Sequence, residues 1–271
     1  GYCNESVMYS PKPQYIRSYG DKSGLAYAGP GDEEEILEFY RNYARKTHGA
    51  TIHPYMDRHR IFDMPYVVVC RRNGRITGYL TFEFVEVDHY TDMYHDLAVR
   101  EIVCEDMETM KQFLTFFASQ IDQIDRVRIY THEENFHMLF TNPDSGENRA
   151  FDGAIQEVGR KNMGYMFRIF DVKEYFRQQS HCERPAEREF TLELQVDDNF
   201  VEENSGSLYL HVKNNSVELT DGPRADVVLR TNIADLSSFV MGAIPLSAFL
   251  WTGRMTCSDR SYEQDIQNAL G

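Results

Sequence analysis

The sequence of 271 residues predicts an α+β fold built from two successive units. Apolar residues recur at helical spacing over residues 33–45 and 107–121, whereas residues 66–71 and 76–87 are rich in β-branched and aromatic side chains. A polar stretch of mixed charge, residues 177–188, separates this part from a second series of short strands. We therefore expect a mixed sheet with flanking helices at 1–178, a linker at 179–188, and a smaller sheet-and-helix unit at 189–271.

The elements of the first unit follow one another with clear boundaries. A helix over 33–45 begins after the turn Gly29-Pro30-Gly31-Asp32, with acidic residues in its first turn, where they suit the helix dipole. Asn73-Gly74 is the dipeptide best suited to a tight hairpin and joins two strands. The expected elements are strands at 66–71, 76–87, 95–103, 126–131 and a closing strand at 165–172, with helices at 33–45, 107–121 and 151–159. Residues 1–10 are expected to be a strand left over from an upstream domain.

The second unit has a simpler pattern. Short strands are expected at 190–196, 207–213, 216–220 and 225–230. Asn232 or Asp235 then caps an apolar helix that runs towards Val240, because both residue types are good helix N-caps. A second apolar stretch, residues 246–251, ends at Gly253.

The global charge limits the partners. The chain carries 43 acidic and 28 basic residues, a formal net charge of −15. A nucleic-acid-binding surface needs clustered Lys and Arg to neutralise phosphates, so nucleic acid is not an expected partner. An acidic field instead attracts cationic amines or lysine-rich peptides, although solubility alone explains the charge equally well.

The cysteines and the apolar runs indicate the compartment. Five cysteines are widely scattered and form no CxxC pair, so neither a zinc site nor a disulfide framework is expected. No apolar run approaches the roughly 18 residues of a membrane span. We expect a cytoplasmic protein with reduced thiols and no membrane span.

Two sets of motifs carry a resemblance to known families. The hairpin leading into Gly78-Tyr79-Leu80, the strand-to-helix passage and the run Met166-Phe167-Arg168-Ile169 resemble the GNAT acetyltransferase layout. In the second unit, Asp226-Val227-Val228-Leu229 before a helix, and Gly242 and Gly253-Arg254-Met255 after it, resemble a sterol-carrier-type domain.

In this order, the two parts resemble the C-terminal portion of the Eis-like GNAT N-acetyltransferases. The resemblance implies a parent enzyme that transfers acetyl from acetyl-CoA to a primary amine. It also implies a missing N-terminal GNAT domain as partner, which binds acetyl-CoA and supplies the acid and oxyanion contacts, and a homo-oligomer. This chain would then shape the amine pocket and the oligomer interface, and would be inactive alone.

The residues that bind the cofactor in the GNAT layout are missing from the corresponding position of this sequence. That layout has a glycine-rich loop after its fourth strand, where backbone N–H groups at a helix start hold the pyrophosphate. Here the strand 95–103 is followed by Cys104-Glu105-Asp106-Met107-Glu108, without a glycine. Each carboxylate close to a pyrophosphate costs roughly 1–4 kcal/mol. We therefore expect Glu105, Asp106 and Glu108 to exclude CoA, and this chain to have no catalytic or cofactor-binding residue.

Two groups of histidines are weaker candidates for a functional site. His48, His53 and His59 lie close together in sequence and could line a cleft, although surface histidines are commoner. His132 and His137 are five residues apart, not the four that place zinc ligands on one helix face, so no metal site is expected.

An apolar stretch in the second unit is another candidate binding site. It could line a lipid pocket, but an aliphatic and aromatic stripe at helical spacing is more often core. The residues concerned are Phe239, Met241, Ile244, Leu246, Phe249 and Trp251. The alternatives to the acetyltransferase reading are thus a protein that binds lipid or acyl chains, and an interaction module without chemistry.

Overall fold

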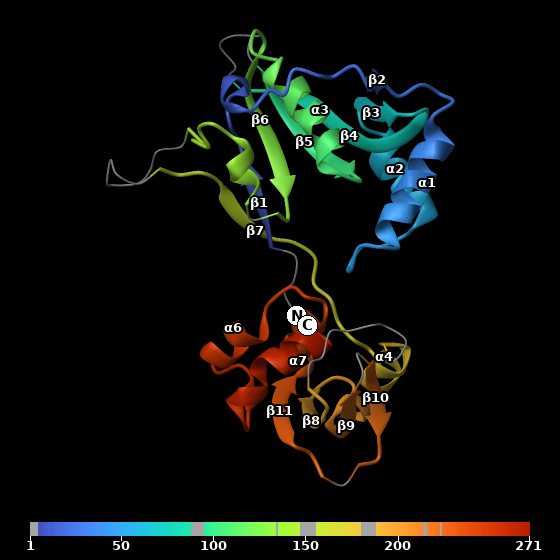
Figure 1. Cartoon of the computed structure of the whole chain (residues 1–271), viewed down its shortest axis with the longest axis vertical. Helices are drawn as coiled ribbons and strands as arrows, with labels where there is room; N and C mark the ends of the chain where they lie inside the picture. The colour runs from blue at the N-terminus through green and yellow to red at the C-terminus, as the bar shows by residue number, and fades with distance from the viewer. Residues whose placement is uncertain are drawn as a thin grey trace. The chain divides into compact units, whose positions relative to one another are not determined.

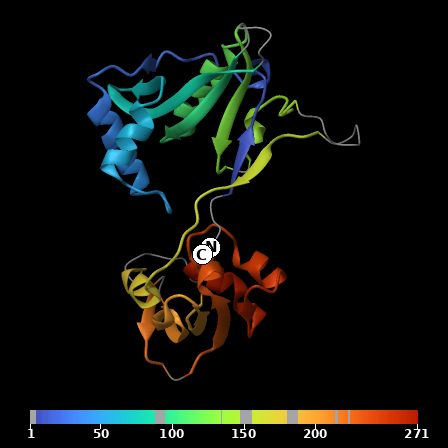
Figure 2. The ribbon, with the colours of Figure 1, turned by 180° about the vertical axis from the view of Figure 1, so that it is seen from behind.

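The computed structural model confirms the α+β fold and describes residues 5–87, 95–133, 135–146, 156–179, 188–213, 216–222 and 224–271. The chain divides into two compact units, which Figures 1 and 2 show from opposite sides. The first unit comprises Ser6–Asn162, and the second comprises Met163–Gly271 with the first five residues.

A mixed sheet of seven strands forms the centre of the first unit. Its order is β2-β3-β4-β5-β6-β1-β7, in which β5 and β6 are parallel and β3-β4-β5 is an antiparallel meander. The strands are β1 (Glu5–Tyr9), β2 (Leu25–Tyr27), β3 (Tyr66–Arg72), β4 (Arg75–Glu86), β5 (His95–Cys104), β6 (Ile124–Thr131) and β7 (Arg160–Met163). The expected N-terminal strand is therefore present as β1, which pairs with β6 inside this sheet.

Helices cover both faces of this sheet. On one face, α1 (Glu33–Ala44) and α2 (Pro54–Phe62) pack Ile36 and Ile61 against Tyr79 of β4. On the other, α3 (Met107–Ala118) packs Phe113 and Phe117 over the strands and contacts the short helix η1 (Pro13–Tyr15). Phe136 of the short helix η2 (Phe136–Leu139) belongs to the same core. The sheet is thus the middle layer between two apolar cores.

The hairpin between β3 and β4 follows the sequence prediction. Asn73 and Gly74 have φ of 52° and 78°, which a two-residue turn of type I′ requires of both central residues. Asn tolerates this left-handed region better than most residues, and Gly enters it without a steric penalty.

A bulge in β5 changes which face its side chains reach. Thr81 of β4 pairs with Glu101, but Phe82 pairs with Val99, so Arg100 is an extra residue. Before the bulge, Val99 joins the core under α3; after it, Val103 joins the core under α1 and α2. An insertion of one residue shifts the two-residue period of a strand, and Glu101 therefore comes to lie on the α1–α2 side.

Three local predictions differ from the structure. The helix expected at 151–159 falls partly outside the described residues, and residues 156–159 are not helical. The closing strand expected at 165–172 is wrong: the strand there is β7, Arg160–Met163, and the following residues run towards a helix. The helix α2 was not expected, because its apolar residues are few and it begins at a proline, the residue that suits a first helical turn.

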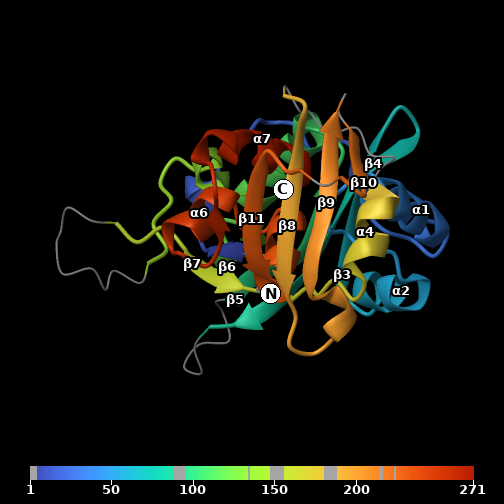
Figure 3. The ribbon, with the colours of Figure 1, turned by 90° about the horizontal axis from the view of Figure 1, so that it is seen from below.

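The second unit is a sheet with helices against one face. Its strand order is β10-β9-β8-β11-β12. Phe190, Leu192, Leu194 and Val196 alternate with half-exposed residues along β8, so one face is buried, and Figure 3 shows the opposite face. The strands are β8 (Phe190–Asp197), β9 (Gly206–Lys213), β10 (Ser216–Thr220), β11 (Val227–Asn232) and β12 (Thr256–Cys257); the helices are α4 (Val172–Gln179), α5 (Ile233–Val240), α6 (Leu246–Trp251) and α7 (Glu263–Leu270), with short turns η3 (Glu202–Asn204) and η4 (Arg260–Tyr262).

Asn232 is the N-cap of α5; it is one of the two residues that the sequence predicted for this position. Its side chain accepts a hydrogen bond from the N–H of Asp235 at 2.9 Å. Asp235 is itself buried and forms an ion pair with Arg254, 2.5 Å from carboxylate to guanidinium. The two residues together fix where the helix starts.

The second unit begins earlier along the chain than residue 189. Val172 and Phe176 of α4 are buried in the same core as β8 and α5. Asn204 accepts a hydrogen bond from Val172 N–H at 3.0 Å and donates one to Phe170 O at 3.1 Å. These contacts hold α4 to the second unit, and most of the expected linker 179–188 lies outside the described residues.

Candidate functional site

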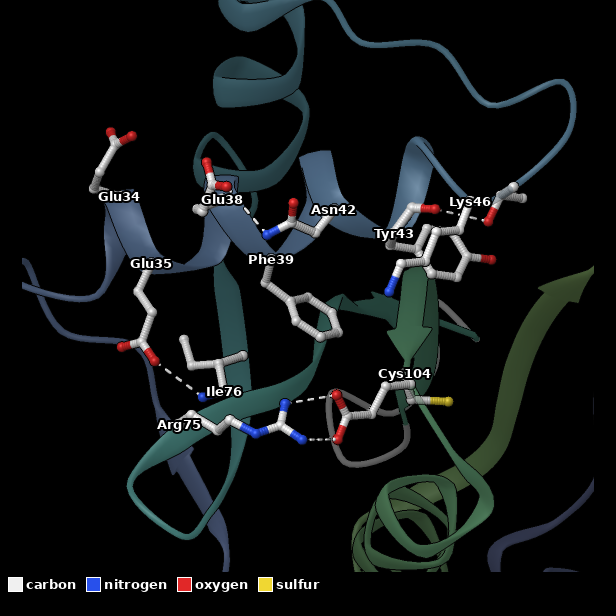
Figure 4. Close-up of a pocket in the computed structure, with 12 residues that line it drawn as sticks. Glu34, Glu35, Glu38, Phe39, Asn42, Tyr43, Lys46, Arg75, Ile76 and Cys104 are labelled. Atoms are coloured by element: carbon white, nitrogen blue, oxygen red, sulfur yellow. Dashed lines mark hydrogen bonds and ion pairs between the residues drawn. The ribbon is translucent and has the colours of Figure 1, made fainter. Parts of the chain in front are cut away.

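A cavity of about 740 Å³ lies in the first unit, between α1 and the ends of β4 and β5. In Figure 4, Glu35 and Phe39 point from α1 towards the start of β4, which carries Arg75 and Ile76. Cys104, the last residue of β5, closes another side. The remaining lining residues are Glu34, Glu38, Asn42, Tyr43, Lys46, Thr47 and Glu105.

Hydrogen bonds and ion pairs connect the start of α1 to the β3–β4 hairpin. Glu35 accepts a hydrogen bond from Ile76 N–H at 2.9 Å, and its other oxygen lies 2.8 Å from the Arg71 guanidinium. Asp32 pairs with the same guanidinium at 2.6 Å. Two acidic residues that suit the helix dipole therefore also fix the wall of the cavity.

Asp106 caps α3. Its side chain accepts a hydrogen bond from Thr109 N–H at 2.9 Å, and its other oxygen forms an ion pair with Arg72. Partial burial acts to raise the pKa of Asp106, but the Thr109 and Arg72 contacts outweigh it, so the pKa is lowered. A backbone N–H at the helix start is thus already occupied by a side chain.

The two neighbouring acids are also paired. Glu105 accepts two hydrogen bonds from Arg75, both of 2.6 Å, and one from Arg72 at 3.4 Å. Glu108 pairs with Lys111 at 2.6 Å. The structure therefore places all three predicted residues at the start of α3, where each carboxylate forms an ion pair with a nearby Arg or Lys.

Cys104 is a weak nucleophile in this setting. Burial, with the nearby charge of Asp106 as a second cause, raises the pKa of its thiol to about 11. Because the thiolate is the reactive form, the side chain is almost entirely unreactive at neutral pH. Cys70, Cys104 and Cys257 are free thiols within the described part of the chain.

A partly buried ionic cluster on the α1–α2 side of the sheet was not found from the sequence. Arg60 of α2 pairs with Glu101 of β5 and with Asp57 at 3.2 Å, and its guanidinium lies 4.5 Å from the centre of the Tyr40 ring. Burial raises the pKa of Glu101, although Arg60 opposes the rise. Glu101 reaches this face only because of the bulge at Arg100, which leaves no signal in the sequence pattern.

The structure does not assemble the three histidines of the predicted cleft into a site. None of them is among the residues that line the cavity. His53 caps α2, accepting a hydrogen bond from Met56 N–H at 3.3 Å, and His59 pairs with Asp63 at 2.9 Å. His48 lies on the surface.

The predicted apolar residues of the second unit fall into two groups. Phe239, Leu246 and Phe249 are fully buried in its core, and Ile244 packs against that core. Met241 is half-buried and lines a separate cavity of about 300 Å³, whereas Trp251 is 86% exposed. The six side chains therefore share no common cavity among those found in the described residues.

The described residues contain neither a cluster of metal-ligating side chains nor a helix that could span a membrane. No group of three or more His, Cys, Asp or Glu side chains in them is arranged to bind a metal ion. Likewise, none of the helices they form is both long enough and apolar enough to cross a bilayer.

Comparisons with known proteins agree with this architecture. Residues 44–169 match an acetyltransferase (GNAT) domain, and residues 172–269 match a sterol carrier protein domain. The first part of the chain is thus similar to a GNAT acetyltransferase domain, and the second part to a sterol carrier protein domain. Comparison with curated proteins finds no significant match.

Solved structures show the same pair of folds. A GCN5-related N-acetyltransferase from Anabaena variabilis superposes with a TM-score of 0.77 at 18% identity, and Eis1 from Mycobacterium abscessus with 0.66 at 17%. A probable N-acyltransferase from Enterococcus faecalis gives 0.74 at 13%. All three matches cover 100% of this chain, which spans 66%, 66% and 65% of those chains respectively.

Proposed function

We propose that this chain is the part of an acetyl-CoA-dependent N-acetyltransferase that does not bind the cofactor. In this proposal, an Eis-like parent carries a further, N-terminal GNAT domain that binds acetyl-CoA. The present chain shapes the pocket for a primary amine and contributes to a homo-oligomer in the cytoplasm. The GNAT domain match and the pair of folds support transfer of an acyl group as the parent's reaction.

The observation that carries the proposal is the start of α3. A helix start holds an anion through open N–H groups and the positive end of the dipole. Asp106 already accepts the Thr109 N–H, and Glu105 presents a second carboxylate beside it. A pyrophosphate there would displace the Asp106 cap and compete with both carboxylates for Arg72 and Arg75. The residues present therefore do not fit acetyl-CoA.

The substrate class rests on charge. The net charge of −15 favours cationic small molecules or lysine side chains over anionic substrates. The cavity beside α1 agrees with this preference, because Glu34, Glu35 and Glu38 contribute to its wall. Each of these acids is already near an arginine, so the charge steers an amine towards the unit and does not by itself define a binding pose.

The first test is a calorimetric titration of acetyl-CoA into this chain at neutral pH. We expect no saturable binding in the micromolar range. The full-length parent, titrated in parallel, is the positive control and should bind. Saturable micromolar binding to this chain alone would overturn the proposal.

A second measurement separates an enzyme part from an interaction module. The parent should release free CoA thiol from acetyl-CoA when a primary amine is added, whereas this chain alone should release none. A parent that shows no amine-dependent release with any of a panel of polyamines, aminoglycosides and lysine peptides would favour the module instead.

A further inference from the structure

One edge of the seven-stranded sheet in the first unit is open. β2 is the first strand in the sheet order, so β3 lies on one side of it, and no strand of the described residues lies on the other (Figure 1). Ala26 and Tyr27 are both exposed, Tyr27 to 63%. Successive side chains of a strand point to opposite faces of a sheet. The helices on the two faces therefore leave this edge uncovered on both sides.

The hydrogen bonds to β3 determine which main-chain groups of β2 point outward. Gly24 C=O accepts from Arg71 N–H at 2.8 Å, and Ala28 N–H donates to a carbonyl of β3 at 2.9 Å. Along an antiparallel pair, residues alternate between bonding the neighbouring strand and pointing away from it. The main-chain groups of Leu25 and Tyr27 therefore point away from β3.

These outward groups include a donor and acceptors that are not in use. The Leu25 N–H donates to Lys22 O at 3.1 Å. In the part of the chain that the structure describes, the C=O of Leu25 and both main-chain groups of Tyr27 have no hydrogen-bond partner. A strand edge with unpaired N–H and C=O groups is a template for a further strand.

The sequence does not protect this edge by charge. Natural sheets commonly place charged side chains, especially Lys, on an edge strand to prevent pairing with another chain. The strand at the opposite edge, β7, follows this rule, because two of its four residues are Arg160 and Lys161. Residues 23–31, which include β2, contain no charged side chain, although 26% of the chain is charged. The edge at β2 is therefore suited to pairing with a strand that is itself uncharged.

From these observations we propose that β2 pairs antiparallel with β2 of a second copy of this chain. A two-fold axis then passes beside Ala26, which lies opposite Ala26 of the second copy. Each Tyr27 N–H donates to the Leu25 C=O of the other copy. The free donor and acceptor of one edge thus match those of an identical edge, as a self-complementary interface requires. The exposed Tyr27 ring packs beside the Leu25 side chain of the other copy, on the same face of the joined sheet.

This inference names the interface of the homo-oligomer in the proposed function, and it rests on that part of the proposal. It does not depend on the cofactor or the amine. β2 contributes no residue to the cavity beside α1, and the acids at the start of α3 belong to a different segment.

The first test is sedimentation equilibrium of the whole chain over a range of concentrations. We expect a reversible equilibrium between monomer and dimer. Ala26→Lys and Ala26→Glu should each remain monomeric where the wild type dimerises, because like charges directly opposite each other in a sheet repel. A mixture of the two variants should dimerise again. Misfolding cannot explain that recovery, since both variants must be folded to pair.

The matched control is Asn162→Lys. It adds the same charge as Ala26→Lys to an exposed residue, but on β7, at the opposite edge of the same sheet. This variant should dimerise like the wild type.

A second pair of variants separates main-chain pairing from side-chain packing. Tyr27→Ala and Tyr27→Pro both lose the ring, but only Tyr27→Pro loses the N–H. Because that N–H points away from β3, proline is compatible with the edge strand. Tyr27→Pro should dimerise about tenfold or more weakly than Tyr27→Ala, since the two-fold axis repeats the lost hydrogen bond.

Three results would overturn the inference. The first is a chain that stays monomeric at every concentration, which would leave the edge to a different partner. The second is a dimer that Ala26→Lys does not weaken, or that the mixture with Ala26→Glu does not restore. The third is equal dimerisation of Tyr27→Pro and Tyr27→Ala. The second result would leave a homo-oligomer with another interface, and none of the three bears on cofactor binding, which the acetyl-CoA titration tests separately.

Discussion

Asp198 shows how a single residue can hold a connecting segment in place. It is 4% exposed and accepts hydrogen bonds from the Arg168 guanidinium at 2.7 Å, from Asn204 at 2.9 Å, and from the N–H of Phe200 at 3.0 Å. Burial acts to raise the pKa of this carboxyl, but the hydrogen bonds outweigh it and the pKa is strongly lowered. The carboxylate therefore joins the segment before α4 to the loop after β8.

Replacing Asp198 by Asn should lower the melting temperature of the second unit at neutral pH, because the amide cannot accept from all of these donors. The folded-state pKa is lowered, so the stabilisation is present above the unfolded value of about 3.9 and is lost as pH falls through the lower folded value. The difference in melting temperature between wild type and Asp198→Asn should thus be constant from neutral pH to about 5 and shrink below about 4.

The control is Asp197→Asn, one residue earlier and exposed. It should melt like the wild type at every pH. Equal losses for the two variants, or a difference that grows on acidification, would rule out this role of Asp198.

At the scale of elements, most of the predicted helices and strands are present. The hairpin at Asn73-Gly74, the strand β5, the helix α3 and the strands β8 to β11 follow from local patterns, because turn chemistry and periodicity are local properties. The strand expected at 165–172 is wrong because this segment is a connection, in which the apolar side chains do not alternate between a buried and an exposed face: Tyr165 is 82% and Phe170 71% exposed, whereas Ile169 and Val172 are buried. Burial of that kind depends on tertiary contacts, which the pattern does not encode.

The N-terminus of α3 permits a direct test of how the acids act. Asp106→Ala should destabilise the first unit by about 1 kcal/mol, the usual cost of losing an N-cap, measured by urea unfolding. Asp106→Asn keeps the capping oxygen and loses the charge that faces Arg72. Asp106→Asn should therefore lower the free energy of unfolding clearly less than Asp106→Ala does. If Asn and Ala were equally destabilising, the ion pair with Arg72 and not the cap would be the important contact.

At the scale of the whole molecule, the apolar residues form separate cores. Phe113 belongs to the core under α3 in the first unit, and Phe239 to the core of the second. Both side chains are fully buried. The sequence predicted two units, but not the residue at which the second begins, because α4 is a short and mostly polar helix that packs on the second unit through Val172, Tyr175 and Phe176.

Phe113→Ala and Phe239→Ala should each cost about 3–5 kcal/mol, the range for truncating a buried Phe. Each should lower the unfolding transition of its own unit and leave the other transition in place, which calorimetry and unit-specific NMR signals would reveal. A single transition shifted equally by both variants would show that the two units unfold together.

The sequence predicted candidate sites made of residues that are close in sequence, but not those assembled from distant segments. The carboxylates at the start of α3 were identified from the sequence because they fall within four successive positions after a strand. The cluster of Arg60, Asp57 and Glu101 was not, since its members come from α2 and β5, and Arg60 and Glu101 lie 41 residues apart in the sequence.

The extra residue in β5 makes this strand unusually sensitive to changes of length. Deleting Arg100 would restore an uninterrupted two-residue period in β5. The side chains of one half of the strand would then have to move to the opposite face of the sheet. Glu101 would then point into the phenylalanine-rich core under α3, or Val99 would leave it. Gene variants that differ by one codon here are therefore expected to be far less tolerated than substitutions of Arg100 itself, whose side chain is exposed and pairs only with Glu83 in the described residues.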